Sequence, residues 1–294
     1  CNFARDAVIV VIDIDGVEHT KKGVHIDHLY EIDISATLDL LAHTKFTLNI
    51  EKWISLALHW KGLWGKKNEF VSNGAIDLYD LNLSLSDTLD DDAILITDSG
   101  FAEVILPTNL DFGPRRRAIH PYSQGSMGFA LPAVIGITAA SQERQIIVVV
   151  GDGSFMMNMQ ELESIRRHNN NVKIVVLNNG GYSIIKRRQT ELFRNRTIGT
   201  DIDDGVSIPD LEELSDVFNF GFTRLNSNMC LTSGLKNLFA MKGRVICEVI
   251  CRDDQSYIEV SHGKNSLGKI VRRPIEDQWP FMDRGLFENE MVID

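Results

Sequence analysis

The sequence is poor in cysteine, and its four cysteines are widely spaced. They show neither the CxxC spacing of zinc and redox sites nor the density of a secreted disulfide scaffold, so we expect a reducing compartment, the cytoplasm. Two of them share one face of an expected strand, where burial is favoured over metal binding. The cysteines are Cys1, Cys230, Cys247 and Cys251, and the last two form this pair.

Long hydrophobic runs are also lacking. The longest stretch free of charged and strongly polar residues, about 127–140, is shorter than the roughly 18 apolar residues of a membrane helix, and Pro132 interrupts it. We therefore expect no membrane span. The N-terminus has no basic segment leading into an apolar one, as a signal peptide would, and no initial Met. We expect the chain to be part of a longer protein.

Basic residues are outnumbered by acidic ones. The 30 Lys and Arg residues against 41 Asp and Glu residues give a net charge of −11. This balance argues against nucleic acid or an anionic membrane surface as a partner, while a small bound anion remains compatible with it. The chain of 294 residues is 44% apolar, which suffices for a core in roughly one to two domains. The acidic run 90–92 is interpreted as a solvated loop.

Short runs rich in β-branched residues alternate with segments of helical periodicity over most of the chain. Such runs are typical of parallel strands that are buried on both faces and joined by amphipathic helices. We predict a doubly wound α/β domain at 67–262, a parallel sheet with helices on both faces. The expected strands are 93–97, 145–150, 172–177 and 244–250, and the expected helices are 78–89, 127–141, 159–168 and 209–219.

The two ends of the chain contain less regular pattern. Residues 1–66 predict one strand at 7–13 and helical packing at 34–41 and 53–58, which is too little for a complete domain. A loop-like stretch at 62–75 separates this piece from the main domain. The tail, 263–294, is expected to be extended with a short final helix.

Polar residues follow two of the expected strands directly. The first strand ends in the sequence GDGSF, where the glycines permit close backbone approach and the next helix offers free N–H groups to a phosphate. Asp152 would lie there as an oxygen ligand. The next strand ends in Asn178-Asn179-Gly180-Gly181. Carboxylate, amide and carbonyl oxygens together suit Mg²⁺.

Either motif alone is also an ordinary turn, because Asp-Gly and Asn-Gly pairs are common turn formers. Their spacing is more informative than either motif alone. The 24 residues from 154 to 177 accommodate one helix and one strand, which brings both motifs to neighbouring strand ends. This pairing resembles the thiamine diphosphate (ThDP) motif, in which GDG is followed by NN.

The resemblance extends over nearly the whole chain and identifies a family. The segments HPYSQGSMGFALPAVIGITAA, VVVGDGSFMMNMQELESI, LNNGGYSIIKRRQTELF and DGVSIPDLEELSDVF resemble the cofactor-binding half of acetolactate synthase-like ThDP enzymes. The tail RRPIEDQWPFMDR resembles the branch of that group found among enzymes of sugar and lipopolysaccharide biosynthesis. Residues 7–41 resemble the last strand and helix of the group's central domain.

The resemblance implies a set of site residues. Mg²⁺ would be bound by Asp152, Asn179 and the carbonyl of Gly181. Met127 would be the apolar wedge that keeps the cofactor bent, although a core methionine is the alternative interpretation. The Gly125 carbonyl would receive the 4′-amino group. The other expected cofactor contacts are Ser99, Gly100, Phe101, Ser126, Gly151, Gly153, Ser154 and Tyr182.

Several nearby residues have weaker expectations. His120 could contact substrate or relay a proton, but a loop histidine is the favoured interpretation. Tyr182 and Gln189 lie on the helix expected to cap the thiazolium side. Arg187 and Arg188 could meet a carboxylate, although a basic surface turn is favoured over that role.

The resemblance also implies an activity and partners. ThDP acts as an electron sink for decarboxylation of a 2-oxo acid, with protonation or transfer to a second carbonyl afterwards. Family members use a glutamate from an N-terminal pyrimidine-binding domain of the partner protomer. No segment here resembles that domain, so we expect this chain to be inactive alone and to need that domain, within a homodimer or tetramer.

Two rival interpretations remain at this point. A non-catalytic subunit or degenerate homologue would retain the fold without turnover. A nucleotide-binding Rossmann protein is disfavoured, because no GxGxxG opens a helix after the first strand.

Overall fold

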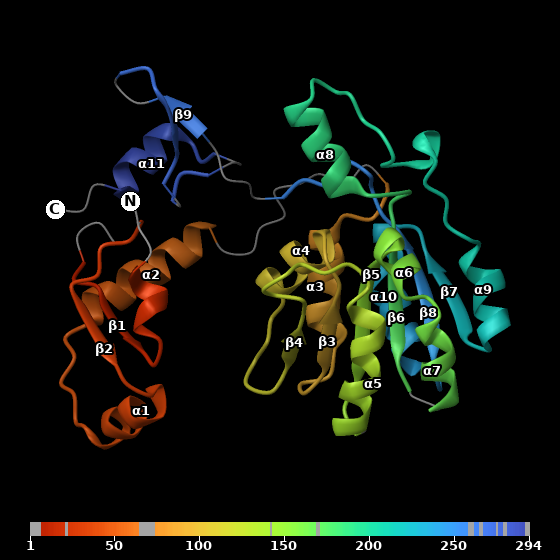
Figure 1. Ribbon diagram of the computed structural model, residues 1–294, viewed down its shortest axis with the longest axis horizontal. Coiled ribbons are helices and arrows are strands. Elements are labelled where there is room, and N and C mark those ends of the chain that lie inside the picture. The colour runs from red at the N-terminus through yellow and green to blue at the C-terminus, as the bar shows by residue number, and fades with distance from the viewer. Residues whose placement is uncertain are drawn as a thin grey trace. The chain divides into compact units, whose positions relative to one another are not determined.

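A computed structural model of the protein describes residues 7–20, 23–64, 74–141, 143–168, 171–257, 262–264, 267–274, 276–278 and 281–291. The chain divides into two compact units (Figure 1). The sheet unit is Asn68–Tyr257, and the smaller unit combines Cys1–Lys67 with Ile258–Asp294.

The sheet unit is built on a six-stranded sheet in the order β4-β3-β5-β6-β8-β7. Every neighbouring pair in this sheet is parallel. The order reverses between β3 and β5, which is the position where open α/β sheets bind their ligands. The strands are β3 (Ile94–Thr97), β4 (Arg117–Ile119), β5 (Ile146–Gly151), β6 (Lys173–Asn178), β7 (Gly221–Leu225) and β8 (Val245–Ile250).

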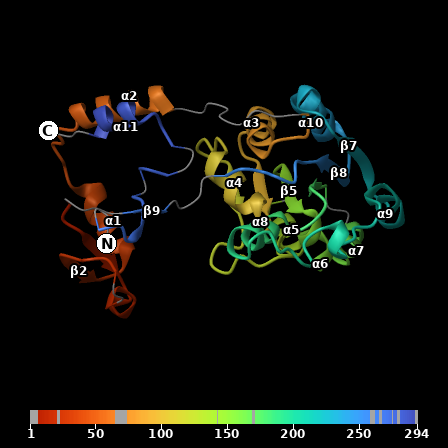
Figure 2. The ribbon, with the colours of Figure 1, turned by 90° about the horizontal axis from the view of Figure 1, so that it is seen from above.

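Helices cover both faces of this sheet (Figure 2). One face packs against α3 (Leu78–Thr88), α4 (Phe101–Asn109) and α10 (Leu231–Ala240). The other packs against α5 (Ala130–Ala140), α6 (Asp152–Met157), α7 (Glu161–Arg167) and α9 (Leu211–Phe218). Helix α8 (Ser183–Leu192) follows β6 and lies over the carboxyl ends of the strands (Figure 1). The predicted doubly wound fold is confirmed.

The strand β5 shows why the sequence pattern predicted this layering. Ile147 and Val149 belong to the core under α3 and α4, whereas Val148 and Val150 belong to the core on the opposite face. All four are 0% exposed. A continuous run of β-branched residues is the pattern that such two-sided burial requires.

The expected strands and helices of this unit are confirmed, with ends that differ by a few residues. Four elements of this unit were not predicted from the sequence: α4, β4, β7 and α10. Pro107 lies inside α4 and obscures its helical pattern. Both β4 and β7 are edge strands with exposed positions, so neither reads as a buried apolar run.

The smaller unit contains short elements. Two strands, β1 (Val10–Asp13) and β2 (His28–Glu31), pair in parallel, and β9 (His262–Lys264) pairs antiparallel with β10 (Ile270–Arg272). In the tail, α11 (Arg284–Met291) is the expected final helix, whereas the hairpin was not expected. The remaining elements are α1 (Ile34–His43), α2 (Glu51–Trp64) and the 3-10 helix η1 (Gly16–Thr20); the sheet unit has η2 (Ile202–Asp204) and η3 (Asn228–Cys230).

The loop predicted at 62–75 is wrong at its start, because α2 continues to Trp64. Most of that stretch, 65–73, lies outside the described residues, as does Cys1. Among the described residues, no helix has the length and apolar character needed to cross a membrane.

Candidate functional site

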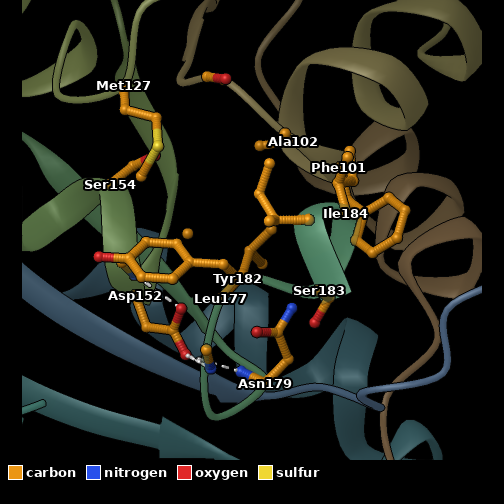
Figure 3. A pocket seen from close by; sticks show the side chains of 16 residues that line it. Phe101, Ala102, Met127, Asp152, Ser154, Leu177, Asn179, Tyr182, Ser183 and Ile184 are labelled. Carbon is orange, nitrogen blue, oxygen red and sulfur yellow. Dashed lines mark hydrogen bonds between the residues drawn. The ribbon is translucent and has the colours of Figure 1, made fainter. Parts of the chain in front are cut away.

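A pocket lies where β3, β5 and β6 end, at the reversal of strand order (Figure 3). The segment after β3, the start of α6 directly after β5, and the segment from the end of β6 into α8 each contribute to it. The lining residues are Ser99, Gly100, Phe101, Ala102, Met127, Gly151, Asp152, Gly153, Ser154, Leu177, Asn179, Gly181, Tyr182, Ser183, Ile184 and Ile185.

Asp152 holds the turn that follows β6. Its Oδ2 accepts backbone N–H groups from Asn179 (3.1 Å), Gly180 (2.9 Å) and Gly181 (3.1 Å), and its Oδ1 accepts the N–H of Gly153 (2.7 Å). These bonds join the two motifs that the sequence placed at neighbouring strand ends. The carboxylate therefore fixes the backbone from which the other predicted ligands project.

Burial dominates the electrostatics of this carboxylate. Asp152 is 1% exposed, and desolvation raises its pKa to about 6 although its four N–H partners act to lower it. A buried carboxylate that lacks a countercharge is costly to ionise. A bound cation would supply that countercharge.

Asn179 provides a second oxygen beside it. Its side chain lies next to Asp152 (Figure 3), and its buried Oδ1 has no hydrogen-bond partner within the described residues. Buried acceptors nearly always have a hydrogen-bond partner, so a buried oxygen without one indicates that a ligand binds there. Asn178 points elsewhere, because its Nδ2 donates to Glu248 (2.6 Å).

The oxygen set matches a hard cation better than a transition metal. No group of three His, Cys, Asp or Glu side chains capable of holding a metal occurs among the described residues. One carboxylate, one amide oxygen and a backbone carbonyl instead leave positions for water and phosphate oxygens, as Mg²⁺ sites commonly do. The residues present therefore fit a magnesium diphosphate.

At two positions in the pocket, neighbouring atoms leave no room for a side chain larger than that of glycine. A Cβ on Gly153 would lie 2.2 Å from Cε1 of Tyr182, and a Cβ on Gly181 would lie 2.2 Å from the backbone oxygen of Thr200. Gly181 also has a φ of +153°, which side-chain-bearing residues rarely adopt. Thr200 accepts the N–H of Tyr182 (2.8 Å), so this neighbouring segment supports the turn from outside.

The opposite side of the pocket is apolar. Met127 is 37% exposed, and the side chain of Ile185 is half exposed. Phe101 and Ile184 complete this side (Figure 3). No Lys, Arg or His occurs among the described lining residues. The pocket thus has a polar floor with an acid and an amide, and an apolar wall above it.

Most of the predicted site residues line this pocket, and three do not. Gly125 and Ser126 lie on the segment leading to Met127, outside the lining set. His120 also lies outside it, and its Nδ1 is 3.4 Å from Oε1 of Glu103. Their predicted roles remain predictions. The predicted residues within the lining are Ser99, Gly100, Phe101, Met127, Gly151, Asp152, Gly153, Ser154, Asn179, Gly181 and Tyr182.

The weaker candidates on α8 lie outside the pocket. Gln189 exchanges hydrogen bonds with Ile198, donating to its carbonyl (3.3 Å) and accepting its N–H (2.8 Å). Arg187 and Arg188 belong to a helix, so the surface turn expected for them is wrong. Arg187 pairs with Glu191 and stacks over the Tyr257 ring.

The expected burial of the cysteine pair is confirmed. Cys247 is 0% exposed and Cys251 is 8% exposed, both in the core under α3 and α10. Burial raises the pKa of both thiols, that of Cys247 to about 12. The acidic run is exposed at Asp90 and Asp91, as expected.

Sequence reasoning missed several lining residues. Ile184 and Ile185 follow the NNGGYS segment, so their position just beyond a strand end was the available signal. Asp98 does not line the pocket but was also missed as a candidate, although it directly follows β3 and is 0% exposed. The other missed lining residues are Ala102, Leu177 and Ser183.

Comparison with known proteins assigns a family to this fold and site. The family model "Thiamine pyrophosphate enzyme, C-terminal TPP binding domain" matches residues 98–249, which contain the strand ends described above. The chain therefore belongs to the thiamine pyrophosphate enzyme family and carries its cofactor-binding domain. Within that family the chain is similar to acetolactate synthases and to a thiamine diphosphate-dependent decarboxylase.

Individual relatives support this assignment. Acetolactate synthase from Arthrospira platensis is 31% identical over 176 residues, covering 60% of this chain and 30% of the relative. The acetolactate synthase large subunit of Lactococcus lactis subsp. lactis (strain IL1403) is 26% identical over 293 residues, covering 98% of this chain and 46% of the relative. The chain thus spans about half or less of the length of these relatives.

A solved structure shares the architecture. The thiamine diphosphate-dependent 4-hydroxybenzoylformate decarboxylase of Rhodococcus jostii RHA1 superposes with a TM-score of 0.66 at 25% sequence identity. The match covers 85% of this chain and 45% of that chain.

Proposed function

We propose that this chain binds ThDP through Mg²⁺ and, within a complete protein, catalyses decarboxylation of a 2-oxo acid or carboligation from it. The observation that carries the proposal is the pairing of Asp152 with the orphaned Asn179 Oδ1 at adjacent strand ends. The family match and the relatives' names support the cofactor and this class of reaction.

In this proposal Asp152, Asn179 and the carbonyl of Gly181 bind Mg²⁺. Ser154 and the turn at 99–101 offer hydroxyl and backbone donors to the diphosphate. The N–H of Gly153 is already bonded to Asp152. Gly153 therefore contributes chiefly by leaving room for the Tyr182 ring.

The apolar wall has a separate role. Met127 supports the bent form of the cofactor, and Ile184 with Phe101 keeps water away from the reacting atoms. When bound, ThDP supplies the electron sink that allows a 2-oxo acid to lose carbon dioxide. The Gly125 carbonyl orients the aminopyrimidine, with Ser126 beside it and His120 as a further contact.

The proposal requires a second domain. The glutamate that activates the cofactor comes from an N-terminal pyrimidine-binding domain, in the same longer protein or in a partner subunit, within a homodimer or tetramer. The small-molecule 2-oxo acid binds between the two domains. The cytoplasm remains the predicted location.

The test is a turnover assay on the complete protein, including residues upstream of this chain. A panel of 2-oxo acids is incubated with ThDP and Mg²⁺, and carbon dioxide release is measured. We expect release from at least one acid, and its loss in Asp152→Ala. The matched control is Asp216→Ala, an exposed aspartate on α9, which should retain activity.

Two other outcomes are informative. Binding of ThDP without turnover of any acid would support a non-catalytic subunit and contradict the proposed reaction. Turnover that survives Asp152→Ala would contradict the assigned metal ligand.

A further inference from the structure

A buried carboxylate, adjacent in sequence to the pocket residue Ser99, belongs to none of the proposed ligand sets. Asp98 directly follows β3 and is 0% exposed. Its Oδ1 accepts the N–H groups of Ser99 (2.9 Å) and Gly128 (3.0 Å), and its Oδ2 accepts that of Ala130 (2.8 Å). The carboxylate therefore joins the loop after β3 to the start of α5.

Gly128 is held from its other side as well. Nδ2 of Asn158 donates to the Gly128 carbonyl (2.7 Å). Gly128 has a φ of +81°, and a Cβ on it would lie 2.7 Å from Cβ of Met157 and 2.8 Å from Nδ2 of Asn158. Both polar groups of this residue are thus fixed by side chains, in a conformation and a space that favour glycine.

The residues linked in this way adjoin three lining segments of the pocket, at Ser99, at Met127 and at α6. Met127 immediately precedes Gly128, Ser99 immediately follows Asp98, and Asn158 immediately follows α6, the helix that carries Asp152. We propose that Asp98 and Asn158 are positioning residues. Their hydrogen bonds to the two polar groups of Gly128, which we call the clamp, hold Met127 toward the polar floor of the pocket, where the diphosphate would bind. The inference rests on the proposed function, because that function gives Met127 its role.

The chemistry of the clamp favours a carboxylate at residue 98. An ionised carboxylate accepts on both oxygens, and its hydrogen bonds are stronger than those of neutral acceptors. An asparagine of the same size would present an NH₂ group to at least one N–H donor. Asp98→Asn therefore keeps the volume and breaks the clamp, which makes it the appropriate variant.

The matched control is another buried aspartate of the sheet unit. Asp77 is also 0% exposed, and it caps α3 by accepting the N–H of Tyr79 (2.8 Å). It does not line the pocket. Asp77→Asn should therefore lower the melting temperature as Asp98→Asn does, without affecting Met127.

The first experiment measures the ThDP dissociation constant of the chain in Mg²⁺ by calorimetry. Loss of charge-assisted hydrogen bonds predicts a rise of about tenfold or more for Asp98→Asn, and a smaller rise for Asn158→Ala. Asp77→Asn should stay within about twofold of the unmodified chain. Equal effects of Asp98→Asn and Asp77→Asn would overturn the proposal, because both would then reflect general destabilisation.

A double-mutant cycle tests whether Asp98 acts through Met127. We expect the effects of Asp98→Asn and Met127→Ala on ThDP affinity to be non-additive, since the clamp has no wedge to position once Met127 is truncated. Asp77→Asn and Met127→Ala should be additive. Additivity in the first pair would overturn the assignment.

A second readout does not depend on the cofactor. In the ThDP-free chain, the ¹³C-methyl resonance of Met127 should shift in Asp98→Asn and Asn158→Ala and remain in place in Asp77→Asn. An unchanged resonance in both clamp variants would overturn the positioning role. If the unmodified chain failed to bind ThDP, the proposed function would fail while this measurement still tested the clamp.

Discussion

The two units of this chain differ in how much they bury. Every buried hydrophobic residue among the described positions lies in the sheet unit, from Ile76 to Cys251. In the smaller unit, α1 has no buried residue and β2 is exposed along its whole length. A parallel strand pair is normally covered on both faces. The sheet unit therefore contains the core that holds its pocket, whereas the described part of the smaller unit has no comparable core.

The sequence provides a way to observe the two units separately. All four tryptophans, at positions 53, 60, 64 and 279, belong to the smaller unit. Tryptophan fluorescence thus follows that unit, and most of the far-ultraviolet circular dichroism follows the sheet unit.

The largest effect is expected from truncation in the core of the sheet unit. Ile147→Ala removes a fully buried side chain, which costs about 2–5 kcal/mol of unfolding free energy. Leu38→Ala, at a residue of α1 that is 56% exposed, should change stability by less than about 1 kcal/mol. Urea unfolding followed by both signals checks this. Similar losses in the two variants would contradict the contrast between the units.

A second prediction concerns the pH dependence contributed by Asp152. Its pKa is raised from 3.8 to about 6 by burial, so the folded chain binds this proton more tightly than the unfolded chain. The stability that Asp152 contributes is therefore lost as pH rises through this window, by up to about 3 kcal/mol. Without metal, the stability of the unmodified chain relative to Asp152→Asn should fall between about pH 4 and pH 6.

Added Mg²⁺ with ThDP should abolish this loss of stability above pH 6, because the cation stabilises the ionised carboxylate of Asp152. Urea unfolding of both chains across this pH range, with and without Mg²⁺ and ThDP, provides the measurement. A stability difference that is independent of pH would show that Asp152 ionises normally.

A third prediction concerns the turn after β6. Gly181→Ala places a Cβ against the Thr200 carbonyl at positive φ, which should cost about 1–3 kcal/mol and weaken Mg²⁺-dependent ThDP binding. The control is Gly136→Ala in α5, where nothing lies within 4 Å and the substitution should be neutral or slightly stabilising. Melting temperature and calorimetry together check both variants. Unchanged ThDP affinity in Gly181→Ala would contradict the prediction that cofactor binding depends on the backbone conformation of this turn.

The smallest effect is expected from removing the smaller unit. A chain trimmed to residues 74–257 keeps the described core and pocket of the sheet unit. It should unfold cooperatively and bind ThDP with Mg²⁺ within about threefold of the full chain, because all the described residues that line the pocket belong to the sheet unit. A trimmed chain that is unfolded would show that the sheet unit depends on the smaller one.

The sequence predicted those parts of the molecule whose causes are local. The run at 145–150 predicted a buried strand, and the spacing of Asp152 and Asn179 predicted their convergence, because parallel strands end at one edge. The clamp could not be predicted in this way. Asp98 meets Gly128 across 30 residues, with no pattern between them. Likewise, only the structure shows that Thr200 supports the turn at Gly181.

The most direct test of the central claim is calorimetric titration of this chain with ThDP, once with Mg²⁺ and once with EDTA, alongside Asp152→Ala. We expect saturable binding in Mg²⁺, its loss in EDTA, and affinity at least about a hundredfold weaker in Asp152→Ala, because the metal loses a charged ligand. Equal affinity in Mg²⁺ and in EDTA, or an unchanged affinity in Asp152→Ala, would contradict it.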